Sequence, residues 1–206
     1  MNQTRKDRDG SGTKSAVLQT ATKIFAQNGF NGSSLAMIAD ASDISVGLIL
    51  HHFKSKEELH AAVLADVAAR YRGAIAGVMT VENPEDAARA LEAVFRFWSR
   101  DETYARISLW SFLEGRPGLA EAEAATSIAL ARTVGTLQAA GKADSRFDPQ
   151  VLLAMTIGPI HFWNRYRDRF KEQLGLAGDD KAMDEDFLRQ FMSLIEKLYA
   201  PVGAAS

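Results

Sequence analysis

The chain has 206 residues, of which 47% are hydrophobic and 24% charged, and its formal net charge at pH 7 is −2. This composition is typical of a folded globular protein and excludes an intrinsically disordered chain. The chain contains no cysteine, which excludes disulfides and cysteine-based zinc sites and favours a reducing compartment, so we predict a cytoplasmic protein. No apolar run reaches the roughly 18 residues that a membrane helix needs, so we expect no membrane partner.

Apolar residues recur at helical spacing through most of the chain, and no segment alternates apolar and polar residues for long enough to form a strand. The sequence therefore predicts an all-α protein of about nine helices. Residues 1–12 are polar and contain glycine, which predicts a disordered arm. The helices are expected at about 13–28, 33–43, 45–53, 55–78, 84–100, 102–114, 119–140, 149–174 and 184–199.

Positive charge is concentrated near the N-terminus. Residues 1–56 contain seven Lys or Arg and four acidic residues, a net charge of +3, which leaves −5 for the rest of the chain. This asymmetry favours the N-terminal quarter as the part that meets an anion.

Two short helices near the N-terminus, at about 33–43 and 45–53, are joined by a tight turn. They are too short to bury their apolar faces against each other alone, so the first helix must pack against both to complete a core. A small core is expected from Val17, Ile24, Phe25, Phe30, Ile38, Ile44, Ile49 and Phe53. This arrangement is typical of a helix-turn-helix unit, whose second short helix enters the DNA major groove. We therefore predict a DNA-binding domain at 13–60 and a second helical domain at 61–206.

Several motifs occur in fixed order within this region: Asn28-Gly29-Phe30, Ser33-Ser34, Ile38-Ala39, Ile44-Ser45-Val46-Gly47 and the stretch from His51 to Leu59. Residues 13–60 resemble the DNA-binding domain of the TetR family of bacterial transcriptional repressors. The resemblance implies a homodimer that binds a palindromic double-stranded DNA operator and is released by a small-molecule effector. It also implies that the residues facing DNA are Ser33, Ser34, Ser45, Val46, Gly47, Leu48, Leu50, His51, His52, Lys54 and Lys56.

Three positions depart from the family pattern. Val46 and Leu48 are apolar where polar residues are common, and Leu50 stands where tyrosine is usual. Apolar side chains can contact thymine methyl groups but cannot form bidentate hydrogen bonds with bases. The alternative for Leu48 and Leu50 is ordinary core packing, and for His51 and His52 it is an exposed surface without DNA.

A metal site at His51 and His52 is disfavoured, because adjacent residues on a helix point about 100° apart. The chain carries no glycine-rich phosphate loop and no motif of a hydrolase or metalloprotease, so we expect neither enzymatic activity nor a cofactor. His161, which precedes Phe162 and Trp163, is the remaining candidate for a general base, and a role in a pocket or interface is favoured for it.

The C-terminal domain is rich in aromatic residues, which favours a pocket for an apolar or aromatic effector, with ordinary core as the alternative. The candidate ligand-binding residues are Phe95, Trp98, Arg106, Trp110, Phe112, Glu114, Met155, His161, Phe162, Trp163 and Asn164. The last two helices have wide apolar faces that suggest a four-helix dimer interface, as the resemblance implies. The candidate interface residues are Leu152, Leu153, Thr156, Ile157, Ile160, Phe187, Phe191, Leu194, Ile195 and Leu198.

Two functions remain open at this point. The first is a dimeric, ligand-responsive repressor in which the effector moves the helix that begins near Lys56. The second is a helical small-molecule-binding or catalytic protein that has lost specific DNA binding.

Overall fold

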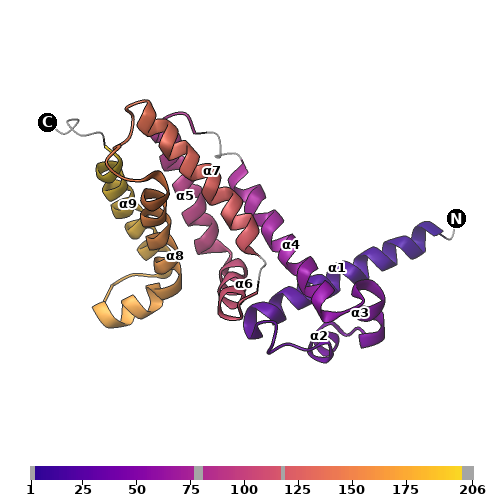
Figure 1. Ribbon diagram of the computed structural model, residues 1–206. Helices are drawn as coiled ribbons and strands as arrows, with labels where there is room; N and C mark the ends of the chain where they lie inside the picture. The colour runs from indigo at the N-terminus through magenta and orange to yellow at the C-terminus, as the bar shows by residue number, and fades with distance from the viewer. Residues whose placement is uncertain (1–2, 77–80, 117–118, 201–206) are drawn as a thin grey trace. The chain divides into compact units, whose positions relative to one another are not determined.

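The computed structural model describes residues 3–76, 81–116 and 119–200 (Figure 1). Within these ranges the chain forms helices and no β-strand. The helices are α1 (Gln3–Asn28), α2 (Leu35–Ser42), α3 (Val46–Phe53), α4 (Lys56–Ile75), α5 (Pro84–Arg100), α6 (Glu102–Leu113), α7 (Leu119–Ala139), α8 (Pro149–Leu174) and α9 (Asp180–Tyr199). The prediction of an all-α fold with about nine helices is confirmed.

The chain divides into two compact units. The first unit comprises Met1–Arg70 with Thr103–Ala122, and the second comprises Tyr71–Glu102 with Glu123–Ser206. The division falls within α4 and α7, and α6 belongs to the first unit. The sequence placed a boundary at residue 60 and assigned α6 to the C-terminal domain, because nothing local indicates that α6 packs on α1.

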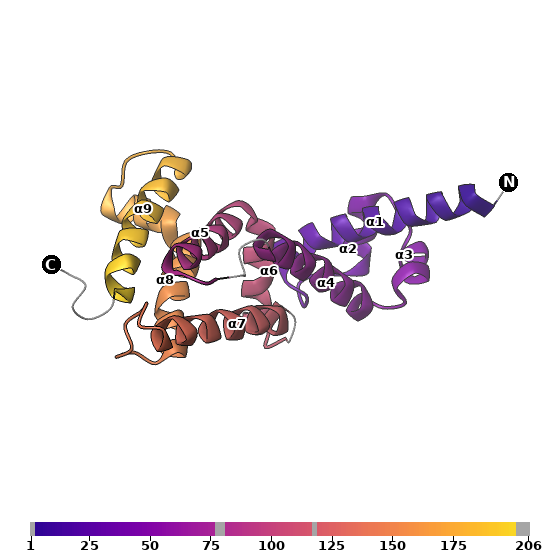
Figure 2. The same ribbon diagram turned by 90° about the horizontal axis from the view of Figure 1, so that it is seen from above.

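The first unit is built around a core of side chains from α1, α2 and α3, which lie side by side in both views (Figures 1 and 2). Val17, Ala21 and Phe25 of α1 are spaced four residues apart, so they form one stripe along the helix, and all three are buried. Ile38 of α2 and Ile49 of α3 close the core against this stripe. Ile24 and Ile44, which were also expected there, are only partly buried.

Most helix starts lie within two residues of the predicted positions, with two exceptions. Ser34, Ser45, Asn83 and Asp148 each accept a hydrogen bond from the first turn of the helix that follows. The exceptions are α1, which begins at Gln3 where a disordered arm was predicted up to residue 12, and α9, which begins earlier than the predicted residue 184. Once the packed part of α1 has nucleated, each added residue gains a hydrogen bond at low cost, so a helix can extend beyond its apolar stripe.

In the second unit, α5 packs against both α8 and α9. Trp163 of α8 stacks on Phe187 of α9 with ring centroids 4.4 Å apart, and Phe187 stacks in turn on Phe95 of α5 at 5.6 Å. This aromatic column contains Phe95 and Trp163, two of the aromatic residues that the sequence assigned to a pocket. None of the described helices is both long and apolar enough to cross a membrane.

Candidate functional site

The turn between α2 and α3 orients the two short helices. Ser34 Oγ accepts from Met37 N (3.2 Å) at the start of α2, and Ser45 Oγ accepts from Leu48 N (3.3 Å) at the start of α3. Asp43 ends α2 in the left-handed conformation, with φ 55° and ψ 39°. Aspartate tolerates this conformation better than most residues, so the turn forms without glycine.

The face of α3 that points away from the core is apolar. Ile49 and Phe53 are buried and hold the helix in place, whereas Val46, Leu48 and Leu50 are 37%, 41% and 38% exposed. The core alternative for Leu48 and Leu50 is therefore wrong within this unit. Gly47 and His51 are exposed beside them. No group of three or more His, Asp or Glu side chains that could hold a metal ion occurs in the described part of the chain.

Ser33 does not lie on this surface, although the sequence placed it among the DNA-facing residues. Its side chain is buried, and its hydroxyl donates to the carbonyl oxygen of Gly29 (2.5 Å). Because this hydroxyl is already satisfied inside the turn that follows α1, Ser33 is a structural residue. This corrects the sequence-based assignment.

Lys56 is also engaged inside the first unit. Its ammonium donates to the carbonyl oxygens of Phe30 (3.0 Å) and Ser33 (2.9 Å) and lies 4.0 Å from the centroid of the Phe30 ring. An ammonium group has three donors, so one remains for another acceptor. The phosphate contact that the resemblance implied for Lys56 is thus secondary to its role of holding the turn between α1 and α2.

Lys54, which follows α3, adopts an unusual backbone conformation with φ 52° and ψ −37°. The amide of Ser55 donates to the carbonyl oxygen of Phe53 (2.5 Å), so Lys54 is the central residue of a γ-turn. This form of the γ-turn is rare and strained for residues other than glycine. The turn places an exposed lysine at the end of α3 at the cost of this strain.

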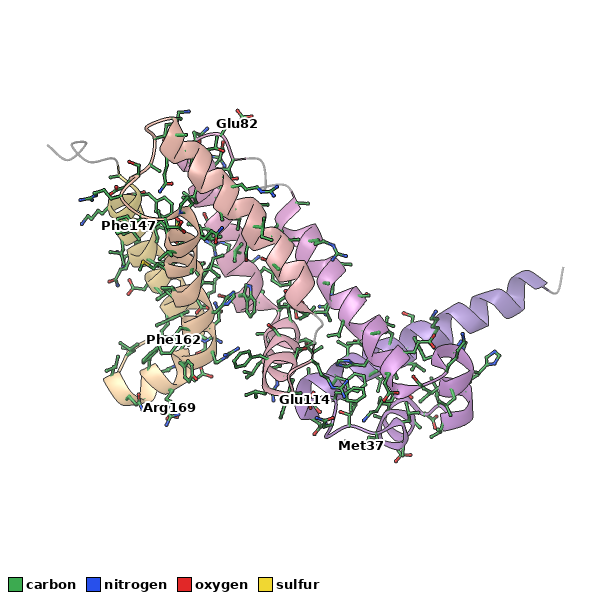
Figure 3. The ribbon with its side chains drawn as sticks, in the orientation of Figure 1. Met37, Glu82, Glu114, Phe147, Phe162 and Arg169 are labelled. Atoms are coloured by element: carbon green, nitrogen blue, oxygen red, sulfur yellow. The ribbon has the colours of Figure 1, made fainter. Side chains whose placement is uncertain are left out.

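The C-terminal end of α6 fastens the same turn from the other side. The carboxylate of Glu114 accepts from the amides of Phe30 (3.1 Å) and Asn31 (2.9 Å) (Figure 3). The Arg116 guanidinium lies 3.5 Å from the centroid of the Phe30 ring, and Arg106 Nε donates to the carbonyl oxygen of Ala26 (3.0 Å). Charged hydrogen bonds of this kind are stronger than neutral ones, so α6 is firmly tied to the end of α1.

Trp110 takes part in this attachment by packing against glycine. Gly29 has a φ of +70°, and a Cβ atom there would lie 2.8 Å from Trp110 Cε3 and 2.7 Å from Glu114 Oε1. The position thus requires glycine for both its conformation and its space. Arg106, Trp110 and Glu114 were predicted to bind ligand, but these contacts occupy them within the first unit, and Phe112 is 80% exposed.

His60 lies in the apolar centre of the first unit. Its ring meets those of Phe25 and Phe30 edge-on, with centroids 4.8 and 5.0 Å apart. Burial is the main reason that the pKa of His60 falls to about 4, and the positive charges of Arg116 and Lys56 lower it further, while Glu114 opposes them. The imidazole is therefore neutral at pH 7.

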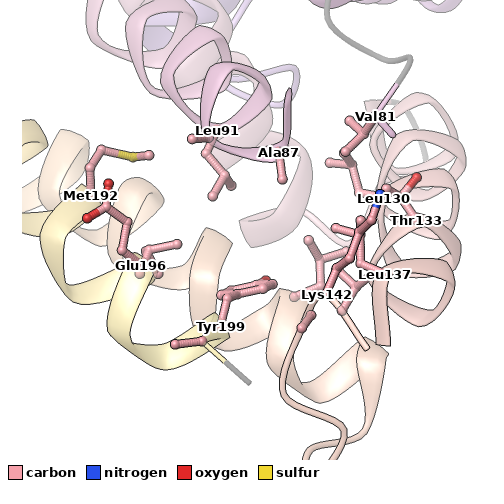
Figure 4. Close-up of a pocket in the computed structure, with 16 residues that line it drawn as sticks. Val81, Ala87, Leu91, Leu130, Thr133, Leu137, Lys142, Met192, Glu196 and Tyr199 are labelled. Atoms are coloured by element: carbon pink, nitrogen blue, oxygen red, sulfur yellow. The ribbon is translucent and has the colours of Figure 1, made fainter. Parts of the chain in front are cut away.

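The second unit contains a cavity of about 230 Å³ between α5, α7, α8 and α9. Its wall is mainly aliphatic. Figure 4 shows the labelled lining residues: Val81 before α5, Ala87 and Leu91 on α5, Leu130, Thr133 and Leu137 on α7, Lys142 after α7, and Met192, Glu196 and Tyr199 on α9. The Tyr199 hydroxyl is hydrogen-bonded to Thr156 Oγ1 (2.9 Å), and burial raises the pKa of Tyr199. Lys142 and Glu196 are exposed and supply the charged groups of the lining.

None of the residues that the sequence proposed for ligand binding lines this cavity. Phe95, Trp98 and Trp163 are core, and Asn164 Nδ2 donates to the carbonyl oxygen of Ile160 within α8 (2.8 Å). The His161 and Trp98 rings are in contact, with centroids 4.1 Å apart, and His161 also borders a separate hollow between α7 and α8. The sequence could not indicate the aliphatic cavity, because Ala, Leu and Val look the same in a filled core and in a cavity wall.

The predicted dimer interface is largely buried within one protomer. Leu152, Leu153, Thr156, Ile160, Phe191 and Ile195 are 0–6% exposed, and Ile157, Phe187 and Leu198 are partly buried. Of the predicted residues only Leu194 is well exposed, at 61%. Four exposed apolar side chains of α8 lie together on another face, at Val151, Met155, Phe162 and Tyr166, and Figure 3 shows Phe162 projecting from α8. The buried residues are therefore not available for contact with a second copy of the chain. The four exposed residues, which form a stripe on α8, are available.

Comparison with known proteins gives the family of the first unit. The family model described as bacterial regulatory proteins, tetR family, matches residues 17–63, which include α2, α3 and the turn between them. Residues 17–63 thus belong to the TetR family. The transcriptional regulators UidR and RutR of Escherichia coli K12 are 39% and 38% identical to this chain over 74 and 63 residues.

These matches cover 34% of this chain and 38% of UidR, and 31% of this chain and 30% of RutR, so they concern less than two thirds of either relative. The fold extends further than the sequence similarity. The structure of AibR in complex with isovaleryl coenzyme A and operator DNA is similar to the present one with a TM-score of 0.71 and 17% identity, covering 92% of this chain and 99% of AibR. The fold of AibR thus spans nearly the whole chain.

Proposed function

We propose that this TetR-family chain is a dimeric transcriptional repressor that works in the bacterial cytoplasm. Two copies bind a palindromic DNA operator through α3, and a small apolar effector releases them. The observation that carries this proposal is the free outer face of α3, which is held by Ile49 and Phe53 and capped by Ser45. The N-termini of α2 and α3 add backbone donors and positive dipole ends, which favour phosphate.

The stripe on α8 supports the dimer. Val151, Met155, Phe162 and Tyr166 recur at intervals of four, seven and four residues, and Leu194 on α9 adds to the exposed apolar surface. Helical spacing places the four α8 residues on one face, which a second copy can cover by two-fold symmetry. A dimer also matches a palindromic operator, since each recognition helix reads one half-site.

The cavity of the second unit supports the effector. An engineered cavity of about 150 Å³ binds benzene, so about 230 Å³ accommodates a ligand of roughly nine or ten non-hydrogen atoms. Its aliphatic wall suits an apolar body, and Lys142 and Glu196 can meet a polar group. AibR, which shares the fold, has been solved with isovaleryl coenzyme A, a small branched acyl group on a larger carrier.

DNA binding is tested by fluorescence anisotropy of the purified chain on DNA from upstream of its own gene, at several salt concentrations. Specific binding by a dimer supports the repressor. The alternative, a helical small-molecule-binding or catalytic protein without specific DNA binding, is supported instead if this DNA and random DNA bind equally at low salt.

Effector binding is tested with the substitution Ala87→Phe, which fills the cavity from α5. Branched and monocyclic aromatic compounds of five to eight carbons serve as probes, and binding is followed by the rise in melting temperature. We expect the substitution to weaken binding more than about tenfold, equivalent to about 1.4 kcal/mol. Ala129→Phe on the exposed side of α7 is the matched control. Equal ligand binding by Ala87→Phe and wild type would exclude this cavity.

A further inference from the structure

The outer surface of α2 and α3 lacks the side chains that usually read bases. Neither Leu35–Ser42 nor Val46–Phe53 contains Arg, Lys, Asn or Gln, and these four residue types form the bidentate hydrogen bonds to guanine and adenine. The exposed side chains of α3 are instead Val46, Leu48, Leu50 and His51. Met37 of α2, which is 38% exposed, adds another apolar side chain to this surface (Figure 3).

The major groove presents one apolar group on its base edges, the C5-methyl group of thymine. The N-terminal residues of a recognition helix are those that contact base edges. Val46 and Leu48 occupy the first and third positions of α3 and are exposed. Gly47 lies between them, and a Cβ atom there would meet nothing within 4 Å, so this end of the helix is open to close approach.

Other features of the same surface favour DNA over a protein partner. Ser34 and Ser45 present two capped helix N-termini next to the apolar side chains. The exposed Lys54 follows α3 directly, and Lys14 Nζ lies 5.4 Å from the centroid of the Phe53 ring at the end of α3. An apolar centre with cations and helix N-termini around it is complementary to base methyl groups flanked by phosphates.

We propose that each operator half-site carries thymines opposite Val46 and Leu48, and that the chain recognises them through their C5-methyl groups. This inference rests on the proposed DNA-binding function and specifies its substrate. His51 supplies the polar contact that α3 retains within the half-site. Sequence discrimination therefore depends on apolar contact, and the hydrogen-bonding pattern of the bases contributes less.

The test replaces thymine by uracil, which keeps every Watson–Crick and groove hydrogen-bonding group and removes only the methyl. The full chain first selects its site from a randomised 30-base-pair duplex library. The selected duplex is then remade with deoxyuridine at each thymine in turn, at the same position of both half-sites. Burying one methyl is worth about fourfold in affinity, so a symmetric pair of replacements should weaken binding roughly 15-fold at the positions facing Val46 and Leu48.

Protein variants connect the effect to the side chain. Leu48→Ala should remove the difference between thymine and uracil at one position of each half-site and leave the others unchanged. Ile128→Ala, which shortens another exposed aliphatic side chain on α7, should keep every difference. Both positions are exposed, so neither change should disturb folding.

The outcomes separate the inference from the function on which it rests. Equal affinity for thymine and uracil at every position, or selected half-sites without thymine, overturns the inference while DNA binding stands. Recovery of no sequence above random DNA overturns both the proposed function and the inference. Loss of affinity confined to one or two thymines per half-site, and abolished by Leu48→Ala, supports the inference.

Discussion

Lys54 combines backbone strain with an exposed charge at the end of α3. Its γ-turn conformation is one that glycine adopts at little cost, and such strain amounts to about 1–3 kcal/mol, partly offset by the greater freedom of glycine in the unfolded chain. We predict that Lys54→Gly raises the free energy of unfolding by about 0.5–2 kcal/mol and lowers affinity for DNA. Thermal denaturation and fluorescence anisotropy measure the two effects.

The matched control is Lys54→Ala, which removes the same charge but keeps a side chain in the strained turn. It should lose as much DNA affinity as Lys54→Gly without the gain in stability. If neither substitution changes affinity for DNA, Lys54 does not face phosphate and the strained turn has only a structural role.

The burial of His60 leads us to predict that the free energy of unfolding depends on pH. Its pKa is lowered in the folded state from 6.5 to about 4, mainly by burial, so the unfolded chain binds a proton at a higher pH than the folded one. The contribution of His60 is therefore present in full above pH 6.5 and is lost as pH falls toward 4, with a total of roughly 1–3 kcal/mol. Urea denaturation across this range should show a shallower decline for His60→Gln than for wild type.

His161 also has a pKa lowered to about 4, mainly by burial, so wild type alone cannot separate the two histidines. The difference between wild type and His60→Gln in how the free energy of unfolding changes with pH isolates the contribution of His60. His51→Gln, at an exposed position of α3, controls for the loss of an imidazole. If the free energy of unfolding changes with pH identically in wild type and His60→Gln, the first unit opens to water before His60 titrates.

At the scale of elements, Glu114 attaches the C-terminal end of α6 to the turn after α1. Its carboxylate accepts from two backbone amides in the turn after α1, so Glu114→Ala would leave the partly buried amide of Phe30 without its acceptor. We predict a loss of about 1.5–3 kcal/mol in the free energy of unfolding for Glu114→Ala, and a smaller loss for Glu114→Gln, which keeps one acceptor oxygen. Glu172→Ala, at an exposed position on α8, should be neutral.

This attachment also gives a test of how effector binding changes the affinity for DNA. If α6 transmits the state of the second unit to the turn after α1, Glu114→Gln should reduce the change in operator affinity that a ligand causes, beyond its effect on stability. An unchanged ligand response in a folded Glu114→Gln variant would assign Glu114 to stability alone.

The range over which a residue acts explains what the sequence could predict. Helix caps act within about four residues, so the starts of α2, α3 and α8, which Ser34, Ser45 and Asp148 cap, were predicted to within two residues from the local pattern. The partner of Lys56 at Phe30 is 26 residues away, and the partner of Glu114 is 84 residues away, so the sequence could not show that these side chains are engaged inside the first unit. On α8 both faces are apolar, and the residue pattern could not show which of them the protomer buries.

At the scale of the whole molecule, the predicted DNA-binding domain at 13–60 offers few charges to bind DNA. The region 13–60 contains four lysines and four acidic residues, and the ammonium of Lys56 is already bonded to two carbonyl oxygens. Lys14 and Lys54 remain near α3, which gives about four phosphate contacts for a dimer. Specific binding must then rely more on apolar contact with bases than on counterion release.

This balance predicts a weak salt dependence. With about four phosphates neutralised, the logarithm of the binding constant should fall with the logarithm of salt concentration at a slope of about −4, against about −10 for lac repressor. Lys54→Ala should reduce the slope by about two, one for each protomer, whereas Leu48→Ala should lower affinity equally at every salt concentration. Anisotropy titrations between 50 and 300 mM salt measure both. A wild-type slope near −10 would show that other cations of the chain dominate binding, and that apolar base contacts are a minor part of it.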